Sequence, residues 1–207
     1  MIIHNIDQHS EAWHEARAGR VTGTRFKALV AGMGTATYND LISDIACEII
    51  TGKQEQGYVS AAMENGTDTE PIARKAYSEL MGVEVKEIGF ITPDEDNYYY
   101  EWIGISPDGY LPDGGILEIK CPLPKTHLGY IEGGKLPTEY RYQVQGQLYV
   151  TDAPYCDFMS YVEGMKPLII RVYPDTELFQ EFEARLNKLI VQVKEKLTIY
   201  RNYDYLN

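Results

Sequence analysis

The sequence predicts an α/β fold in which one central mixed β-sheet is flanked by helices. Short runs rich in apolar and β-branched residues fill the middle of the chain, whereas helical spacing of apolar residues dominates both ends. A helical pattern at residues 137–150 also separates two strand-like runs, which implies a crossover connection and hence a mixed sheet. No linker rich in Pro, Gly or Ser divides the 207 residues, so we expect a single domain.

Helices are expected through residues 10–82. Ser10 is a suitable N-cap for the first, and the second is expected to begin around residues 22–24. A later helix is expected over about residues 68–81. Pro71 fits only within a first helical turn, so this helix should not begin much earlier.

The sheet is expected within residues 83–173, and a long C-terminal helix within residues 175–203. The expected strands are residues 83–91, 99–105, 116–120, 155–162 and 168–172. Apolar residues in the last segment recur at steps of four and three, as in a helix packed on the sheet or on a neighbouring subunit: Leu178, Phe182, Leu186, Leu189, Val193, Leu197 and Tyr200.

The most informative segment consists of two runs, an apolar and aromatic run at residues 102–110 with a Pro-Asp-Gly break near its end, and a β-branched-rich run at residues 116–121. The turn residues between the two runs predict a hairpin. Side chains alternate along a strand, so Glu118 and Lys120 share one face, and Asp108 lies at the end of the partner strand. Two carboxylates that converge from neighbouring strands suit Mg²⁺, and a lysine beside them suits the activation of water for cleavage of a phosphodiester.

Each part of this hairpin also has an ordinary structural explanation. Glu-x-Lys is common on strands as an exposed ion pair, and Pro-Asp-Gly is a frequent turn sequence. The apolar neighbours of Glu118 and Lys120 nevertheless indicate a largely buried strand, where a charged pair normally has a chemical role. The combination therefore favours a metal-dependent nuclease site.

Polar residues on two predicted helices are candidates to support this site. Gln143 and Gln147 are four residues apart and share a helical face, whereas Gln145 points away. Their amides could hold water or a phosphate, although a solvated polar face is nearly as consistent with the spacing. Glu70 falls near the start of its helix, where it either complements the helix dipole or faces the hairpin.

A candidate anion pocket lies near the N-terminus. Arg17 precedes a helix start at Thr22 to Thr24, where backbone N–H groups, hydroxyls and a guanidinium together suit a phosphate. An N-cap threonine and a surface ion pair of Arg17 are the plain alternative. Ser106, two residues before Asp108, could add a phosphate contact or could be an ordinary strand hydroxyl.

The net charge of −12 argues against DNA binding by the surface as a whole. Acidic residues crowd segments such as 94–96 and 177–183, however, which leaves room for a basic channel. Basic residues gather in two groups: Arg17, Arg20, Arg25 and Lys27, and Lys120, Lys125, Lys135 and Arg141.

Other residue types exclude several classes of protein. The three cysteines lack any Cys-x-x-Cys spacing, so neither a zinc site nor a disulfide framework is expected. The four histidines show no spacing typical of metal ligands. The N-terminus does not resemble a leader and no long apolar run is present, so we expect a soluble cytoplasmic protein without a membrane partner.

The hairpin sequence resembles the catalytic core of the lambda exonuclease and YqaJ-type viral recombinase family, within the PD-(D/E)xK nuclease superfamily. The resemblance rests on Ser106-Pro107-Asp108-Gly109 and Leu117-Glu118-Ile119-Lys120-Cys121-Pro122. Three further blocks, residues 13–24, 66–74 and 142–148, are similar to other motifs of the family and occur in its order. Together the blocks span roughly residues 10–165 and imply a restriction-endonuclease-like nuclease core over the single domain 1–207.

The family resemblance implies a Mg²⁺-dependent 5′-to-3′ exonuclease that digests one strand of linear duplex DNA and leaves a 3′ single strand. It implies two ions per site, replaceable by Mn²⁺, with a catalytic and metal-binding set of Asp108, Glu118, the Ile119 carbonyl and Glu70, completed by Lys120 and Gln143. It also implies that a terminal 5′-phosphate is bound by Arg17 and Thr24, with Thr22 and Ser106 as further candidates.

The same resemblance implies partners and a setting. It predicts a ring-shaped homotrimer around DNA, delivery of the product to a single-strand annealing recombinase, and a phage or prophage protein acting in the cytoplasm of a bacterial host. Two alternatives are a sequence-specific or structure-specific endonuclease with the same hairpin and a non-catalytic acidic mimic of DNA. Cutting of closed circular DNA would indicate the first, whereas a mimic would need neither Mg²⁺ nor Lys120.

Overall fold

The computed structural model describes residues 1–54 and 61–204, and only the backbone of residues 61–67. A four-stranded sheet contains, in spatial order, β3 (Gly109–Tyr110), β4 (Ile116–Lys120), β5 (Cys156–Ser160) and β6 (Leu168–Val172). The β3–β4 and β5–β6 pairs are antiparallel, and the β4–β5 pair is parallel. The sheet is therefore mixed, as the sequence predicts.

The parallel pair β4–β5 follows from the predicted crossover. Two helices, α5 (Pro124–Gly133) and α6 (Arg141–Thr151), lie between these strands in the chain, and a short turn cannot join parallel strands. Almost every residue of β4 and β5 is buried, which explains their nearly continuous apolar sequence. Glu118 and Lys120 are thus held on an interior strand.

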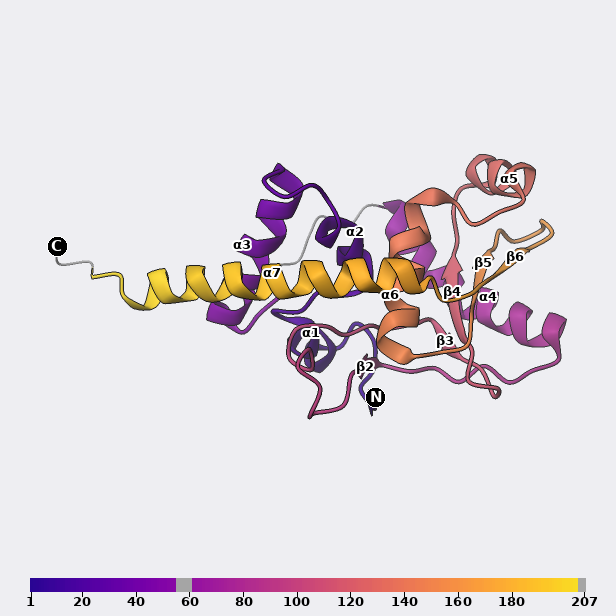
Figure 1. Cartoon of the computed structure of the whole chain (residues 1–207). Coiled ribbons are helices and arrows are strands. Elements are labelled where there is room, and N and C mark those ends of the chain that lie inside the picture. Colours follow the sequence, from indigo (N-terminus) through magenta and orange to yellow (C-terminus); the bar gives the residue numbers. More distant parts are fainter. Residues whose placement is uncertain (55–60, 205–207) are drawn as a thin grey trace.

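Helices surround the sheet and extend beyond it (Figure 1). The remaining helices are α1 (Glu11–Arg17), α2 (Phe26–Leu29), α3 (Ala36–Thr51), α4 (Ala61–Met81) and α7 (Thr176–Arg201), with short 3₁₀ turns at Gly23–Arg25 and Thr138–Tyr140. Figure 1 shows α4 and α5 around the sheet, and α7 running from the sheet past α2 and α3 toward the C-terminus. Within the described residues, no helix has the length and apolar run that a bilayer crossing requires.

The apolar face of α7 completes the main hydrophobic core. Leu178, Phe182, Leu186, Leu189 and Val193 are buried in one cluster with apolar residues of α2 and α3. The long C-terminal helix predicted from the spacing is confirmed, and its inner face packs within the chain itself. At the other end, Ser10 caps α1 as predicted, because its hydroxyl accepts a hydrogen bond from the Trp13 N–H at 3.2 Å.

Two predicted strands are wrong. Only β2 (Phe90–Thr92) forms within residues 83–92, and it pairs with β1 (Ile2–His4), which the sequence did not predict. Residues 99–102 form a turn, in which the Asn97 side chain accepts from the Tyr99 N–H and the Tyr99 carbonyl accepts from the Trp102 N–H. Ile103 and Ile105 make only isolated β-bridges, to Val21 and Ile91. The aromatic composition of residues 99–105 favoured a strand, but local hydrogen bonds and burial of Ile103 decide the conformation.

Helix α4 begins earlier than predicted. It includes Pro71 well inside the helix rather than in its first turn, so the backbone lacks one helical hydrogen bond there. Packing of the buried Ala73 and Tyr77 against β4 and its neighbours holds this helix in place in spite of the proline.

Candidate active site

The turn before β3 places Asp108 beside β4. The Asp108 N–H donates to the Leu117 carbonyl at 3.0 Å, and its Oδ2 accepts from the Ile119 N–H at 2.6 Å. The carboxylate thus occupies the position on β4 where a longer β3 would have continued the ladder. Because β3 is so short, the Asp108 side chain lies next to Glu118, as the predicted hairpin requires.

Glu118 is only 1% exposed, although it carries a carboxylate. Its Oε1 accepts from Gln143 Nε2 and forms a salt bridge with Lys120, and its Oε2 accepts from Gln147 Nε2 at 2.5 Å. These donors compensate for the loss of water, which a buried carboxylate otherwise cannot tolerate. The buried charge on β4 is therefore built into the sheet, which the surface ion-pair explanation does not account for.

Both predicted glutamine positions on α6 meet this carboxylate. Gln143 and Gln147 share a face toward Glu118, whereas Gln145 is bonded to the Tyr173 carbonyl and the Asp175 N–H. The four-residue spacing made both glutamines candidates, and the family resemblance favoured Gln143 alone, whereas both amides donate to Glu118. Gln147 Oε1 is buried and has no hydrogen-bond partner in the described part of the chain, so one acceptor remains available.

Lys120 remains charged beside these groups. Burial lowers its pKa, but the neighbouring carboxylates of Glu118 and Asp108 outweigh burial and raise it overall. Its ammonium also lies 5.6 Å from the centre of the Tyr140 ring. A lysine held in this way is a fixed positive charge rather than a proton acceptor.

Glu70 approaches the same site from α4. Its carboxylate pairs with Arg74, which also donates through Nε to the Asp108 carbonyl at 2.7 Å and pairs with Glu87 at 2.8 Å. Burial raises the pKa of Glu70, Arg74 lowers it, and Glu118 raises it further. Burial likewise raises the pKa of Asp108 well above the usual value, with Glu118 and Glu70 adding to the effect. The three acids repel one another at one site.

The carboxylates of Asp108, Glu118 and Glu70 are the oxygen ligands that Mg²⁺ prefers, although each of them is bonded to side chains or backbone groups of the protein. Among the described residues, no three His, Cys, Asp or Glu side chains already form a metal-binding cluster. Burial raises the pKa of Asp108 and of Glu70 most, and repulsion by the neighbouring carboxylates adds to it; a bound divalent cation would offset that repulsion. The Leu117 carbonyl and the Ile119 N–H both bond to Asp108. Backbone groups of residues two apart in a strand point to the same side, so the Ile119 carbonyl also points toward the edge of β4 beside Asp108.

A second polar pocket surrounds Arg17. Its guanidinium lies 3.4 Å from both the Ser106 and the Thr22 hydroxyls, and 4.0 Å from the centre of the Trp13 ring. The indole N–H of Trp13 in turn donates to Ser106 at 2.8 Å. Burial, reinforced by Arg25, lowers the pKa of Arg17 to about 10, while Glu48 opposes the shift. No carboxylate oxygen of the described residues lies within salt-bridge distance of Arg17. We call this group the Arg17 pocket.

Thr24 stands apart from the Arg17 pocket. It is exposed within the 3₁₀ turn Gly23–Arg25, whereas Thr22 is buried beside Arg17. Gly23 between them lies against α6, since a Cβ at this position would be 3.5 Å from Gln143 Cγ. The Arg17 pocket and the carboxylate site are therefore neighbours, separated by one glycine.

Glu48, which was not among the residues predicted from the sequence, supports the turn that carries Arg17. This α3 side chain is 2% exposed and accepts from the Gly19 N–H at 2.8 Å and from the Arg25 guanidinium. Gly19 has a φ of 73°, which favours glycine, so the turn depends on this residue. The available signal was a glutamate on the apolar face of its helix.

Comparisons with known proteins agree with this geometry. Residues 12–154 match the model of the YqaJ-like viral recombinase domain. The fold is similar to the crystal structure of an alkaline exonuclease from Laribacter hongkongensis, LHK-Exo, with a TM-score of 0.82, 32% identity, and coverage of 93% of this chain and 96% of that one. A second structure of LHK-Exo in complex with dAMP gives the same values.

Two more distant proteins are also similar. A phage-related exonuclease from Haemophilus somnus 129PT has a TM-score of 0.65 with 16% identity, covering 86% of this chain and 95% of that one, which shows the fold alone. The uncharacterized protein R354 of Acanthamoeba polyphaga mimivirus is 33% identical over 109 residues. That match covers 46% of this chain and spans 19% of the length of the viral protein.

Proposed function

This chain belongs to the YqaJ-like viral recombinase family, and we propose that it is a divalent-cation-dependent 5′-to-3′ exonuclease acting on linear double-stranded DNA. The observation that carries the proposal is the buried Glu118, bonded to Lys120 and two α6 amides and flanked by Asp108. LHK-Exo, at 32% identity over nearly the whole chain, bears the name exonuclease, which supports the reaction class.

The carboxylates and the lysine have separate tasks in this proposal. Asp108, Glu118, Glu70 and the Ile119 carbonyl would hold Mg²⁺ or Mn²⁺, at two ions per site. The bound cations supply positive charge that activates water and offsets the charge on the phosphate. Lys120 orients the attacking water and stabilises negative charge as it develops.

The amides of α6 keep Glu118 in position. Gln143 and Gln147 donate to different oxygens of that carboxylate, so its plane is fixed with respect to β4. A carboxylate oriented in this way does not have to reorganise when substrate arrives, which is the basis of electrostatic preorganisation. Gln143 and Gln147 are therefore positioning residues in this proposal.

The Arg17 pocket accounts for the direction of digestion. The Arg17 guanidinium has no carboxylate partner among the described residues and lies beside two hydroxyls, and Gly23 alone separates this pocket from the helix that contacts Glu118. These features suit a terminal 5′-phosphate. Anchoring that phosphate would place the neighbouring phosphodiester at the carboxylate site. We propose Arg17, Thr22 and Ser106 as its contacts. The exposed Thr24 would join them only from the side that faces solvent.

The product and the assembly follow from the same family membership. We propose that digestion leaves a 3′ single strand for annealing recombination, that a single-strand annealing recombinase receives it, and that the active form is a homotrimer enclosing DNA. Enclosure would help a chain with a net charge of −12 to retain DNA. The proposed setting is the cytoplasm of a bacterium that carries a phage or prophage.

The test compares linear duplex DNA with and without a 5′-phosphate, and closed circular DNA, in Mg²⁺ or in EDTA. We expect digestion of the phosphorylated linear duplex in Mg²⁺ only, and none by the Lys120→Ala variant. The Arg17→Gln variant should lose the preference for a 5′-phosphate, whereas Lys27→Gln, which removes an exposed charge nearby, should retain it.

Three outcomes would contradict the proposal. Equal cutting of closed circles would indicate an endonuclease. Activity of Lys120→Ala equal to the wild type would exclude the assigned role of the lysine. Retention of the 5′-phosphate preference by Arg17→Gln would remove the basis for the direction of digestion.

A further inference from the structure

A basic groove lies against residues 18–20, in the turn that follows Arg17. It has a volume of about 580 Å³ and is lined by the turn after α1, by Glu101 and Trp102, and by one face of the C-terminal part of α7. Its charged side chains are Arg20, Lys194 and Arg201, against the single carboxylate of Glu101. The groove is thus positively charged in a protein whose net charge is −12.

The positive charge arises from a segregation of charge along α7. Glu177, Glu181 and Glu183 occupy its first part, whereas residues 185–201 carry five basic side chains and one glutamate. Basic residues near a helix C-terminus complement the helix dipole, which accounts for Arg201. The dipole does not account for Arg20 and Trp102, which come from other segments and face the same groove.

Within the described part of the chain, the basic side chains of the groove form no salt bridges. No carboxylate oxygen of the described residues lies within salt-bridge distance of Lys194 or Arg201. Lys194 Nζ lies 5.7 Å from the centre of the Trp102 ring, and Arg20 is fixed by the Tyr100 and Ile103 carbonyls through Nη1. An anchored guanidinium, two cations without a carboxylate partner among the described residues, and an indole face are the components that bind the backbone and bases of single-stranded nucleic acid.

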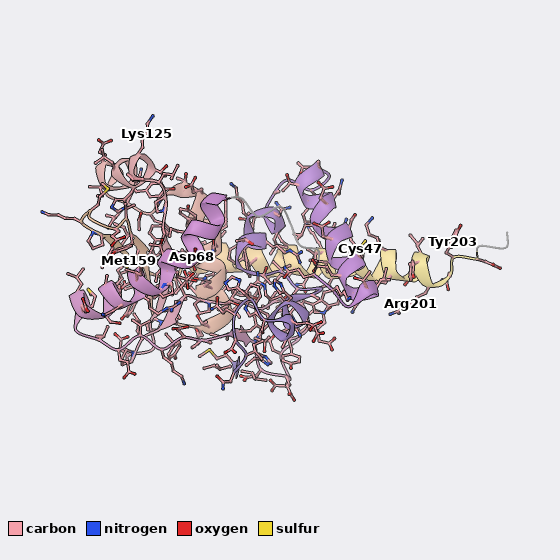
Figure 2. The ribbon with its side chains drawn as sticks, turned by 180° about the vertical axis from the view of Figure 1, so that it is seen from behind. Cys47, Asp68, Lys125, Met159, Arg201 and Tyr203 are labelled. Carbon is pink, nitrogen blue, oxygen red and sulfur yellow. The ribbon has the colours of Figure 1, made fainter. Side chains whose placement is uncertain are left out.

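The groove also borders the proposed 5′-phosphate pocket. Glu48 and Ile49 are consecutive on α3, and both lie against Gly19: Glu48 accepts from the Gly19 N–H, and Ile49 lines the groove together with Gly19. Figure 2 shows Arg201 near the far end of α7, well away from Met159 in the sheet. The groove is therefore separate from the carboxylate site and leads away from it.

We propose that this groove, which we call the α7 groove, binds the single strand that digestion leaves. The inference rests on the proposed exonuclease function. In the proposed complex, successive phosphates of the strand contact Arg20, Lys194 and Arg201, and one unpaired base stacks on Trp102. A base in that position displaces the Lys194 ammonium toward the adjacent phosphate. Duplex DNA, whose bases are already stacked and paired, cannot make the Trp102 contact.

The test measures binding of a fluorescent oligothymidylate by the full chain in EDTA, as a function of salt. Each phosphate contact contributes about 0.7 to the slope of log K against log salt for a single strand, so Lys194→Gln/Arg201→Gln should reduce the slope by about 1.4. Between about 50 and about 200 mM salt, the wild-type affinity should then fall about sevenfold more than that of the variant.

A matched control removes the same charge from the same helix. Lys188→Gln/Lys196→Gln replaces two exposed lysines, of which Lys196 faces a different groove beside Ile199 and Tyr200, so the slope should stay near the wild-type value. Trp102→Leu keeps an apolar side chain but should weaken single-strand binding about fivefold or more, and Trp102→Phe should restore most of it.

Several results would overturn the α7 groove as a single-strand site. An unchanged slope for Lys194→Gln/Arg201→Gln, or an equal reduction in the Lys188→Gln/Lys196→Gln control, would do so. The assignment to single strands would be excluded if these substitutions weakened binding of a blunt duplex of the same length as much as they weaken binding of the single strand. Nuclease assays on phosphorylated duplex test the proposed function separately, because binding in EDTA requires no cleavage.

Discussion

Replacing Glu48 by glutamine separates the stability of the Arg17 turn from its role in binding phosphate. The substitution keeps the shape of the side chain but leaves the Arg25 guanidinium, which is 17% exposed, without its charged partner. It also weakens the acceptor for the Gly19 N–H, which is bonded to Glu48 at 2.8 Å. Both groups belong to the turn that leads from Arg17 to Thr22.

The magnitude follows from the burial of this pair. Removing one partner of a buried ion pair costs ~3–5 kcal/mol, and the glutamine oxygen can still accept one hydrogen bond, so we expect about 3 kcal/mol for Glu48→Gln. For a chain of this size that corresponds to a decrease in Tm of about 6–12 °C. Arg25→Met/Glu48→Met removes both charges and should cost less, about 1–3 kcal/mol, chiefly because the Gly19 N–H loses its acceptor.

The assay compares digestion rates on duplexes with and without a 5′-phosphate, at a temperature where each variant is folded. A small displacement of the Arg17 guanidinium would lengthen its contact with the 5′-phosphate. The ratio of the digestion rates with and without a 5′-phosphate should therefore fall about tenfold or more in both variants. The double variant is the decisive one, since it is closer to wild-type stability. If it kept the full preference for a 5′-phosphate, the reasoning that Glu48 positions the turn would be refuted.

Other predictions concern the carboxylate site. Lys120→Met should lower kcat by about 10²–10³ with little change in KM, and equal losses in both parameters would contradict its role in the chemical step. Gln147→Leu should lower the free energy of unfolding by about 1–3 kcal/mol, because a buried oxygen of Glu118 loses a donor; urea titration measures this change, and an unaltered midpoint would contradict it. In EDTA, stability should fall as pH rises from the usual carboxyl pKa of 3.8 toward the higher folded pKa of Asp108, because the folded state retains the proton longer. Asp108→Asn should flatten that decline, which thermal unfolding at a series of pH values measures. A steeper decline in Asp108→Asn than in the wild type would refute the sign assigned to the pKa shift of Asp108.

The hairpin could be predicted from the sequence because its determinants are local. The alternation of side chains placed Glu118 and Lys120 on one face, and turn residues fixed the position of Asp108. The strand predicted at residues 99–105 failed because apolar and aromatic composition does not distinguish a continuous strand from a turn followed by isolated β-bridges. The turn at residues 99–102 is held by local hydrogen bonds, among them one from the Tyr99 N–H to the Asn97 side chain, about which composition carries no information.

The contact of Gln147 with Glu118 and the role of Glu48 could not be predicted, because both depend on contacts between distant segments. Gln147 shares a face with Gln143, but only the position of α6 over β4 shows that both amides reach Glu118. Glu48 lies on the buried face of α3, yet its partners Gly19 and Arg25 come from an earlier part of the chain. Helical spacing therefore indicated which faces are buried, whereas the partners across the interface required the fold.

The charges of the site link cation binding to DNA binding. Among the described residues, Lys120 and Arg74 are the cations that lie close to Asp108, Glu70 and Glu118, so without Mg²⁺ the site is a poor place for another negatively charged phosphate. Divalent cations would reverse that repulsion, and linkage requires that DNA then tighten cation binding by the same factor. The Arg17 pocket needs no cation, since its guanidinium faces no carboxylate among the described residues. A 5′-phosphorylated end should therefore still bind in EDTA while the scissile phosphodiester stays out of the carboxylate site, so end recognition and catalytic engagement become separable steps with different cation requirements.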